Sequence, residues 1–243
     1  RRDHVFPDNF TPENLRGCTE DSLKHLGVES LDLTQLHCLP TEVLRQGEVF
    51  DEMRKQQAAG LIRHWGVSVE SMEEALICME QDGLTSLQII FNVFRRKPAE
   101  ILFEKAKAMN IAIIVRLPLA SGLLSGKLSS NSTFAENDHR DFNADGQFFN
   151  VGETFAGLGL DKGTELADEL KQFVPEDMRM ATMALRWILD FDGITTIIPG
   201  ASRMEQAQDN ASASKLPSLP DELHEKLKAF YHERVTSHIR GPY

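Results

Sequence analysis

Several polar side chains fall at the points where apolar, strand-like stretches of this sequence end. His37 follows "LDLTQL", Ser68 follows "IRHWGV", and Arg116 follows "IAIIV". Gln88 and Asn92 lie in a fourth such stretch, "LQIIFN". Imidazole, hydroxyl, amide and guanidinium groups can orient a carbonyl, hold an amide or meet an anion. Their shared position suggests one functional edge of a sheet.

Each of these residues also has a structural interpretation. A lone histidine at a strand end is more often a hydrogen-bonded structural residue than a catalytic one. Ser68 can cap the next turn, and Gln88 and Asn92 can satisfy backbone groups of loops. Arg116 is harder to explain in this way, because a guanidinium after an apolar strand needs a partner or water. Polar residues occur at the ends of several predicted strands, and this favours a functional role over separate structural ones.

A glycine-rich stretch, "PLASGLLSGK", covers residues 118–127. Glycines let backbone N–H groups approach a pyrophosphate, and Lys127 can neutralise its charge. The stretch is one residue short of a P-loop, and Leu128 stands where that motif has Ser or Thr, so we exclude a nucleoside triphosphatase. A plain glycine-rich turn with a solvated lysine is the alternative.

Arg203 precedes a predicted helix in "IIPGASRMEQAQDN". A phosphate bound there would also meet the free N–H groups of the first helical turn. An ordinary surface arginine is the alternative interpretation.

Strand-like and helix-like stretches alternate along the chain, and this predicts parallel βαβ units. Thr11 is a predicted N-cap, and Ser71 with Glu74 forms a predicted capping box. The predicted strands are residues 30–37, 62–69, 86–92, 111–119 and 193–201. The predicted helices are residues 12–27, 48–60, 71–83, 98–110, 164–173, 175–191, 204–214 and 220–235.

A barrel and an open doubly wound sheet both fit, but the G-x-G-x-x-G fingerprint of the open sheet does not occur. In a barrel, the carboxyl ends of all strands meet at one rim, where active sites are built.

Composition limits the classes of function. The 243 residues are 41% hydrophobic and carry a formal net charge of -11, which is enough for one core and opposes a nucleic-acid surface. The one basic cluster, Arg95-Arg96-Lys97, is predicted to be a solvated turn. We therefore expect one domain over residues 1–243 and no nucleic-acid partner.

Three cysteines without a C-x-x-C pair favour reduced thiols in a cytoplasmic protein and argue against a zinc site. No apolar run approaches the roughly 20 residues that span a bilayer, so no membrane partner is expected. Residues 1–10 lack the apolar core of a signal peptide. The long segment from Ser121 to Gly163 contains several glycines and is predicted to be a mobile cover over a ligand.

Taken in order, these motifs resemble the aldo-keto reductase family. "SLDLTQLH" resembles its strand that ends in the catalytic histidine, and "GLIRHWGVSV" its G-x-x-R-x-x-G-V-S segment. "LQIIFNVF" resembles its strand with a cofactor-binding glutamine, "PLASGLLSGK" its P-L-a-x-G-L-L-t-G-K loop, and "TTIIPGASRMEQAQDN" its cofactor segment. The order and spacing agree from about Thr11 onward.

The resemblance implies a (β/α)8 TIM-type barrel that binds NADP(H) without a Rossmann fold. His37 matches the catalytic histidine that orients the substrate carbonyl, and Ser68 and Gln88 match residues that hold the nicotinamide carboxamide. Arg116 falls where the family often has an aromatic ring, and its planar guanidinium can also cover the nicotinamide. The residues that match the pyrophosphate-side loop are Pro118, Leu119, Gly122, Leu124, Gly126 and Lys127. The residues that match the adenine and 2'-phosphate site are Gly200, Ser202, Arg203, Gln206 and Asn210.

Two departures from the family pattern affect these expectations. Val69 stands where the family usually has asparagine, which removes one carboxamide contact. The family's catalytic tyrosine, lysine and aspartate precede its histidine strand, but only 30 residues precede that strand here, and they contain no tyrosine. Three βα units need on the order of 80 to 100 residues. We therefore expect only strands 4 to 8 of the barrel, with the first three βα units missing, and no reductase activity from these 243 residues alone.

The sequence thus favours an NADPH-dependent oxidoreductase that reduces aldehydes or ketones by hydride transfer. The alternative is a non-catalytic cofactor-binding module of the same fold. A glycosidase is a distant third, because no pair of acidic residues lies on the strand ends. The substrate's identity, the oligomeric state and the physiological role cannot be derived from these motifs.

Overall fold

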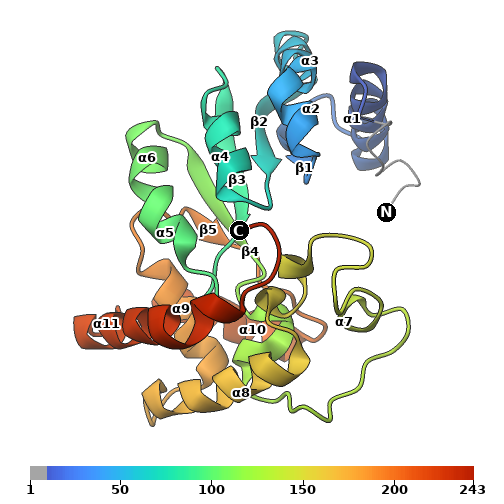
Figure 1. The fold of residues 1–243 in the computed structure, drawn as a ribbon. Coiled ribbons are helices and arrows are strands. Elements are labelled where there is room, and N and C mark those ends of the chain that lie inside the picture. The colour runs from blue at the N-terminus through green and yellow to red at the C-terminus, as the bar shows by residue number, and fades with distance from the viewer. Residues whose placement is uncertain (1–9) are drawn as a thin grey trace. The chain divides into compact units, whose positions relative to one another are not determined.

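The computed structural model describes residues 10–243, so the expectation about a signal peptide lies almost wholly outside the described residues. The contacts divide the chain into two compact units. The first unit is Arg1–Gln88 with Lys105–Ile113, and the second is Ile89–Glu104 with Ile114–Tyr243 (Figure 1). The expectation of one domain over residues 1–243 stays a prediction, and each unit is described by itself.

Parallel strands form the centre of the first unit. They are β1 (Leu31–His37), β2 (Ile62–Ser68) and β3 (Leu84–Ile90), the last of which continues into the second unit. β1 pairs with β2 and β2 with β3, both in parallel. The register places His37 opposite Ser68 and Ser68 opposite Gln88. The ends of β1 and β2 therefore lie level with Gln88, which comes shortly before the end of β3, so the three polar residues lie together as the sequence predicted.

Helices of the first unit follow the predicted start and stop signals. They are α1 (Pro12–Leu26), α2 (Thr41–Gln46), α3 (Glu48–Ala58) and α4 (Met72–Met79), with most of α6 (Phe103–Ala108). Thr11 caps α1 by accepting from the Asn14 N–H at 3.3 Å, and Gly27 ends it with a left-handed φ of 67°. The predicted capping box of Ser71 and Glu74 is confirmed. The short helix α2 was not predicted.

A close approach between neighbouring strands depends on Gly66. A Cβ at this position would lie 2.1 Å from the Ser86 Oγ and 2.5 Å from the Ser86 carbonyl oxygen. Real Cβ atoms do not approach backbone this closely, so a side chain at position 66 would force β2 and β3 apart. On the helix side of the sheet, Phe50 of α3 packs on Trp65 of β2 with ring centroids 5.8 Å apart, and both are fully buried.

The second unit is mainly helical. Its elements are α5 (Lys97–Ile101), the end of β4 (Ala112–Arg116), α7 (His139–Phe142), α8 (Leu160–Leu170), α9 (Met180–Leu189), β5 (Thr196–Ile197), α10 (Met204–Ser212) and α11 (Asp221–Phe230). β4 and β5 pair in parallel, and α9 contacts both β5 and α10 (Figure 1). Phe91 stacks on Trp187 at 4.9 Å and meets Phe191 edge-on at 5.1 Å. This aromatic cluster forms part of the unit's core.

The prediction that Arg95-Arg96-Lys97 is a solvated turn was wrong. Arg95 is 1% exposed, and its guanidinium lies 4.2 Å from the centre of the Tyr243 ring. It also donates to the Pro242 carbonyl at 3.1 Å. An aromatic face and main-chain acceptors from a distant part of the chain replace the water that the local sequence implied.

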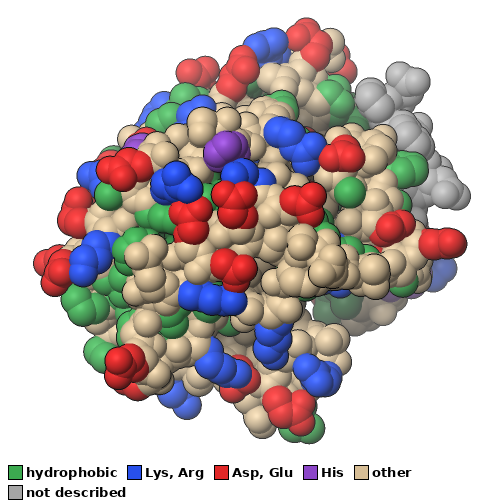
Figure 2. All heavy atoms as spheres, turned by 60° about the horizontal axis from the view of Figure 1, so that its bottom comes forward, with side chains coloured by type: hydrophobic (Ala, Val, Ile, Leu, Met, Phe, Trp, Pro, Cys, Tyr) green, Lys and Arg blue, Asp and Glu red, His purple; other side chains and the backbone are tan. Residues whose placement is uncertain are grey.

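The surface mixes charges of both signs. Acidic and basic side chains are interspersed on the face drawn in Figure 2. Exposed pairs such as Lys162 with Glu165 and Lys226 with Glu222 add little to stability, because solvent screens them. Stability therefore rests mainly on the cores of the units. Within residues 10–243, no helix has the length and apolarity that a bilayer crossing requires.

We predict that Gly66→Ala lowers the free energy of unfolding by about 1–3 kcal/mol, because the methyl group has no space against Ser86. Urea denaturation monitored by tryptophan fluorescence measures the loss. Gly17→Ala is the matched control, since nothing lies within 4 Å of a Cβ there and alanine favours the helix interior. An unchanged midpoint for Gly66→Ala would show that the strands separate at no cost.

Candidate functional site

The first unit holds a chain of hydrogen-bonded side chains at the predicted functional edge. The Ser68 hydroxyl donates to the Gln88 Oε1 at 3.4 Å, and the Gln88 Nε2 donates to the Gln35 Oε1 at 2.7 Å. The Gln35 Nε2 then donates to the Ser86 Oγ at 3.2 Å. Ser68 and Ser86 are buried, whereas Gln88 is partly exposed. The network fixes which end of the Gln88 amide is the donor and which the acceptor.

The Gln88 amide has capacity for a further partner. A primary amide offers two N–H donors and two acceptor lone pairs, and the network uses one of each. The remaining donor and acceptor suit another carboxamide, which presents the complementary pair. Ser68 and Gln88 are thus brought together, as predicted. Val69 is 2% exposed and offers only an apolar side chain at the position where the family has asparagine.

His37 lies beside this network on the edge strand of the first unit. Its side chain is exposed, while Leu36 before it and Leu39 after it are buried. The strand ladder continues past it, because the Cys38 N–H donates to the Ser68 carbonyl at 2.9 Å. Cys38 then takes a left-handed φ of 51° and turns the chain. The backbone therefore holds the exposed imidazole at the end of β1.

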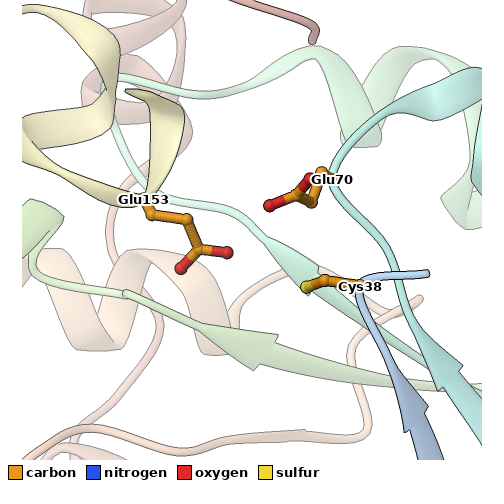
Figure 3. A group of neighbouring side chains, drawn as sticks. All are labelled: Cys38, Glu70 and Glu153. Carbon is orange, nitrogen blue, oxygen red and sulfur yellow. The ribbon is translucent and has the colours of Figure 1, made fainter. Parts of the chain in front are cut away.

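Cys38 and Glu70 follow the ends of β1 and β2, and Figure 3 labels both side chains. The Cys38 Sγ and a Glu70 carboxylate oxygen lie within 4.8 Å of each other. Two such ligands are fewer than the three or four that protein zinc sites use. We draw no metal site from this pair.

The predicted pyrophosphate loop of the second unit has an unusual backbone. Leu117, Ala120 and Ser121 have positive φ angles of 51°, 48° and 55°, which cost energy in residues other than glycine. Gly122 follows with a φ of 99°. The Ser121 hydroxyl holds this conformation, because it donates to the Glu153 carbonyl at 3.1 Å and accepts from the Phe155 N–H at 3.1 Å.

Two cavities of the second unit adjoin this loop and the start of α10. The larger has a volume of about 800 Å³, and the smaller about 380 Å³. The predicted residues that line the larger cavity are Pro118, Leu119, Gly122, Gly200, Ser202 and Gln206. Those that line the smaller are Leu119, Gly126, Lys127, Gly200, Gln206 and Asn210. Two motifs that are far apart in the sequence therefore meet around the same space.

Hydrogen bonds fix the segment at the start of α10, and this segment lines both cavities. The Gln206 Oε1 accepts from the Ser202 N–H at 2.8 Å, the Ser202 hydroxyl at 3.0 Å and the Arg203 N–H at 3.2 Å. The Asn210 Nδ2 donates to the Gly200 carbonyl at 3.2 Å. These bonds fold the segment 200–203 onto the helix, so Gln206 and Asn210 have a structural role in addition to the predicted binding role.

Three predicted cofactor residues of the second unit do not line either cavity. Leu124 is fully buried, so its side chain serves the core. Arg203 is exposed on the surface. Arg116 is buried and its Nη1 donates to the Glu153 carboxylate. The partner that the sequence required for this guanidinium is therefore Glu153, which ties the segment 121–163 to the end of β4.

The sequence analysis missed a charged group that lines the larger cavity, Asp138-His139-Arg140. Arg140 donates to both Asp138 oxygens, at 3.0 and 2.6 Å, and lies 4.2 Å over the Phe134 ring. The hydrogen bond from Arg140 lowers the pKa of Asp138 to about 2. Burial lowers the pKa of His139, whose ring nitrogen lies 3.5 Å from the Ser121 Oγ. The only sequence signal was an acid two residues before an arginine.

The sequence model of the aldo/keto reductase family matches residues 1–232. An aldo-keto reductase of Schizosaccharomyces pombe whose name specifies NADP(+) is 23% identical, over 86% of this chain and 59% of that protein. The NADH-specific methylglyoxal reductase of Escherichia coli is 24% identical, over 87% of this chain and 62% of that protein. Among solved structures, the glycerol dehydrogenase of Gluconobacter oxydans aligns with a TM-score of 0.73 and 26% identity, over 96% of this chain and 68% of that one.

These comparisons bear on three expectations from the sequence. They support the α/β class with a parallel sheet, because the solved relative shares the fold over nearly the whole chain. They do not support the expectation of missing N-terminal units, because the family match begins at residue 1. They give no support either to the expectation that the 243 residues are inactive. The chain spans 57% to 63% of the length of the first relatives it matches.

The family match covers nearly all of the sequence and includes every motif from the histidine strand to the start of α10. The chain therefore belongs to the aldo/keto reductase family.

Proposed function

We propose that this chain is part of an NADPH-dependent oxidoreductase that reduces the carbonyl group of small aldehydes or ketones. The observation that carries the proposal is the pair of cavities in the second unit. The glycine-rich loop and the start of α10, identified separately in the sequence as nucleotide-binding motifs, line both of them. Their volumes fall in the roughly 300–1,000 Å³ range of small-molecule sites.

The residues present fit a nicotinamide cofactor. In the second unit, Lys127 supplies a cation and Gly122 and Gly126 leave the loop backbone open to phosphate oxygens. In the first unit, the partly exposed Gln88 amide, oriented by Ser68 and Gln35, has a donor and an acceptor for the nicotinamide carboxamide. When bound, the cofactor supplies the hydride.

His37 is the residue we assign to the substrate carbonyl. Its imidazole is exposed at the end of a fixed strand, so it can donate a hydrogen bond to a carbonyl oxygen and set its orientation. A misplacement of ~1 Å in such a position can lower the reaction rate about 100-fold. We also propose that the Arg116 guanidinium lies near the nicotinamide, where its Nη1 donates to the Glu153 carboxylate.

The proton donor is not found among the two tyrosines of the sequence. Both lie in the second unit, where the Tyr231 and Tyr243 hydroxyls are 2.6 Å apart. Burial raises the pKa of Tyr231 and strongly raises that of Tyr243. The alternative from the sequence analysis, a cofactor-binding module without turnover, stays the second candidate function. Measuring NADPH oxidation with a panel of aldehydes and ketones separates the two candidates.

Small, oxygen-rich carbonyl compounds are the first substrates to test. The names of two relatives include methylglyoxal and glycerol. Both compounds carry oxygens on neighbouring carbons. The names also differ in cofactor, one specifying NADH and another NADP(+). The choice of NADPH for this chain therefore rests on its own cationic residues.

We predict that Arg203→Ala weakens NADPH binding about tenfold and NADH binding by less than twofold. A hydrogen bond between charged groups is worth about 1.5–3 kcal/mol, and only NADPH has the 2'-phosphate to accept it. Fluorescence titration of both cofactors measures the change. Equal losses for the two cofactors would assign Arg203 to the shared part of the nucleotide.

We predict that His37→Ala lowers kcat about 100-fold and leaves the Kd for NADPH within twofold, because the imidazole orients the carbonyl and not the cofactor. Steady-state kinetics and cofactor titration measure the two quantities. The matched control is His64→Ala, an exposed histidine in the first half of β2. A parallel loss of cofactor affinity would place His37 in the cofactor site.

We predict that amide hydrogen exchange in residues 121–163 slows on adding NADPH. These residues contribute Ser121, Gly122, Asp138 and Arg140 to the larger cavity, so a bound ligand would stabilise their backbone. Exchange mass spectrometry with and without NADPH measures the change, with helix α1 as the internal reference. No slowing at a saturating concentration of cofactor would refute the role of this segment as a cover.

A further inference from the structure

A serine, a histidine and an aspartate lie in a row beside the larger cavity of the second unit, and all three line it. The Ser121 Oγ lies 3.5 Å from the His139 Nε2. The His139 Nδ1 lies 3.5 Å from the Asp138 Oδ1. In this order a carboxylate orients an imidazole, and the imidazole can take a proton from a hydroxyl. The proposed carbonyl reduction assigns no role to these three groups.

The two ring nitrogens of His139 face different partners. The Asp138 carboxylate favours the tautomer with its proton on Nδ1, which leaves the Nε2 lone pair directed at Ser121. Both distances exceed the roughly 2.6–3.2 Å of a tight contact between catalytic groups, and such contacts are often looser before a substrate is bound. The arrangement therefore gives each group the partner that proton transfer requires.

The charges of the histidine and the aspartate suit these roles. Hydrogen bonds from Arg140 lower the pKa of Asp138 to about 2, so this carboxylate stays ionised. Burial lowers the pKa of His139, and the nearby Arg140 adds to the decrease. The Asp138 and Glu153 carboxylates oppose this decrease without reversing it. The imidazole is therefore neutral at physiological pH and can act as a base.

The backbone presents the Ser121 hydroxyl from a strained turn. Its φ of 55° and ψ of 23° are left-handed, and serine nucleophiles of hydrolases also lie on strained turns that expose the hydroxyl. The oxygen accepts from the Phe155 N–H at 3.1 Å, which stabilises negative charge on it. Its hydrogen has two acceptors within reach, the Glu153 carbonyl and the His139 Nε2, and rotation about the C–O bond exchanges them.

Arg140 places a cation beside this serine. Its Nε and Nη2 donate to Asp138, and its guanidinium lies 4.2 Å from the centre of the Phe134 ring. Asp138 engages only these two nitrogens, so the Nη1 group stays available. A Cβ on Gly122, the residue after Ser121, would lie 3.7 Å from Nη1. The Nη1 donors are therefore held where negative charge on an oxygen bound next to Ser121 would meet them.

We propose that Ser121, His139 and Asp138 make the larger cavity a second reaction site, which hydrolyses small carboxylic esters. The Ser121 Oγ attacks the ester carbonyl carbon, and its proton passes to the His139 Nε2. Arg140 donates to the carbonyl oxygen as that oxygen becomes negative. The alcohol leaves with the proton from Nε2, and an acyl-serine remains. Water then gives a proton to Nε2 and attacks the acyl carbon, and the carboxylic acid is released as that proton returns to Ser121.

This activity does not depend on the proposed function. Water is the second reactant, and neither a hydride nor a nicotinamide takes part. The cavity of about 800 Å³ has room for a small ester, and the apolar side chains of Pro118, Leu119 and Ile198 can contact its acyl chain. Proposed cofactor residues line the same cavity, so the hydrolysis is measured without cofactor.

Hydrolysis of 4-nitrophenyl acetate by the 243-residue chain tests the proposal. We expect Ser121→Ala and His139→Gln each to lower kcat/KM about 100-fold or more, which is the usual size of proton-transfer catalysis. Glutamine can keep a hydrogen bond to Ser121, but it cannot take the proton. Ser125→Ala is the matched control, because Ser125 lies in the same loop and lines the same cavity, while its hydroxyl donates to the Gly122 carbonyl. We expect no comparable loss from it.

Covalent labelling identifies the nucleophile independently of turnover. Phenylmethylsulfonyl fluoride transfers its sulfonyl group to an activated serine oxygen and releases fluoride. Peptide mass spectrometry should find the label on Ser121 in the wild-type chain, and much less of it in His139→Gln. Ser121→Ala also removes the bonds to Glu153 and Phe155. Ser121→Cys is therefore the second variant, since it keeps a nucleophile at position 121, which the ester should acetylate.

The pH dependence separates a base from a structural histidine. We expect kcat/KM to rise with pH through an inflection below 6.5, the ordinary imidazole value, because His139 acts when neutral and burial lowers its pKa. An inflection above that value, unchanged turnover in His139→Gln, or a label on another residue would overturn the proposal. So would a wild-type chain that hydrolyses the ester no faster than Ser121→Ala.

The outcomes for esters and carbonyls are separable. A chain that hydrolyses esters through Ser121 but reduces no aldehyde or ketone refutes the proposed function alone. A chain that reduces carbonyls with NADPH but shows no hydrolysis that depends on Ser121 refutes the second reaction site alone.

Discussion

The parallel pairing of β1, β2 and β3 is the constraint on which the chemistry of the first unit depends. It sets His37, Ser68 and Gln88 in register at one edge, and the ladder extends one residue further through the Cys38 N–H and the Val69 N–H. A slip of one residue would turn Ser68 to the opposite face, because side chains alternate along a strand. Gly66 permits the close approach to Ser86 that keeps this register.

A comparable constraint governs the second unit, where strain in one loop is held by contacts from another segment. The positive φ angles of Leu117, Ala120 and Ser121 each cost roughly 1–3 kcal/mol and persist only when surroundings fix them. The Ser121 hydroxyl bonds and the pair of Arg116 with Glu153 provide that support. These bonds therefore join the glycine-rich loop and the end of β4 to residues 153–155 of the same unit.

The sequence predicted the features that depend on local pattern. Strand ends, the N-cap of Thr11 and the capping box of Ser71 follow from residue types within a few positions of one another. The glycine-rich loop and the Gly200–Asn210 segment were identified in the same way, and they line the two cavities. Local rules also failed at one helix start. Helix α9 begins at Met180 and not at Pro175, because residues 175–179 form a turn.

Contacts between distant residues had no sequence signal. Arg95 looked solvated because its partner Tyr243 lies near the other end of the sequence. Glu153 has no periodic or motif relationship to Arg116, and neither does Asp209 to Arg179. Such pairs depend on how loops return to the strand ends, which hydrophobic periodicity does not encode. Of these pairs, Arg179 with Asp209 lines the 380 Å³ cavity and contributes to its local charge.

The net charge of the chain and the local charge of its cavities have different consequences for binding. The total of -11 opposes binding to an extended polyanion, which meets many surface charges at once. A single phosphate meets only the groups within about one Debye length, roughly 8–10 Å in physiological salt. The charged residues that line the 380 Å³ cavity are Lys127, Lys171, Arg179 and Asp209. A chain that is acidic overall can therefore have a cavity with a cationic lining, because nearby charges outweigh distant screened ones.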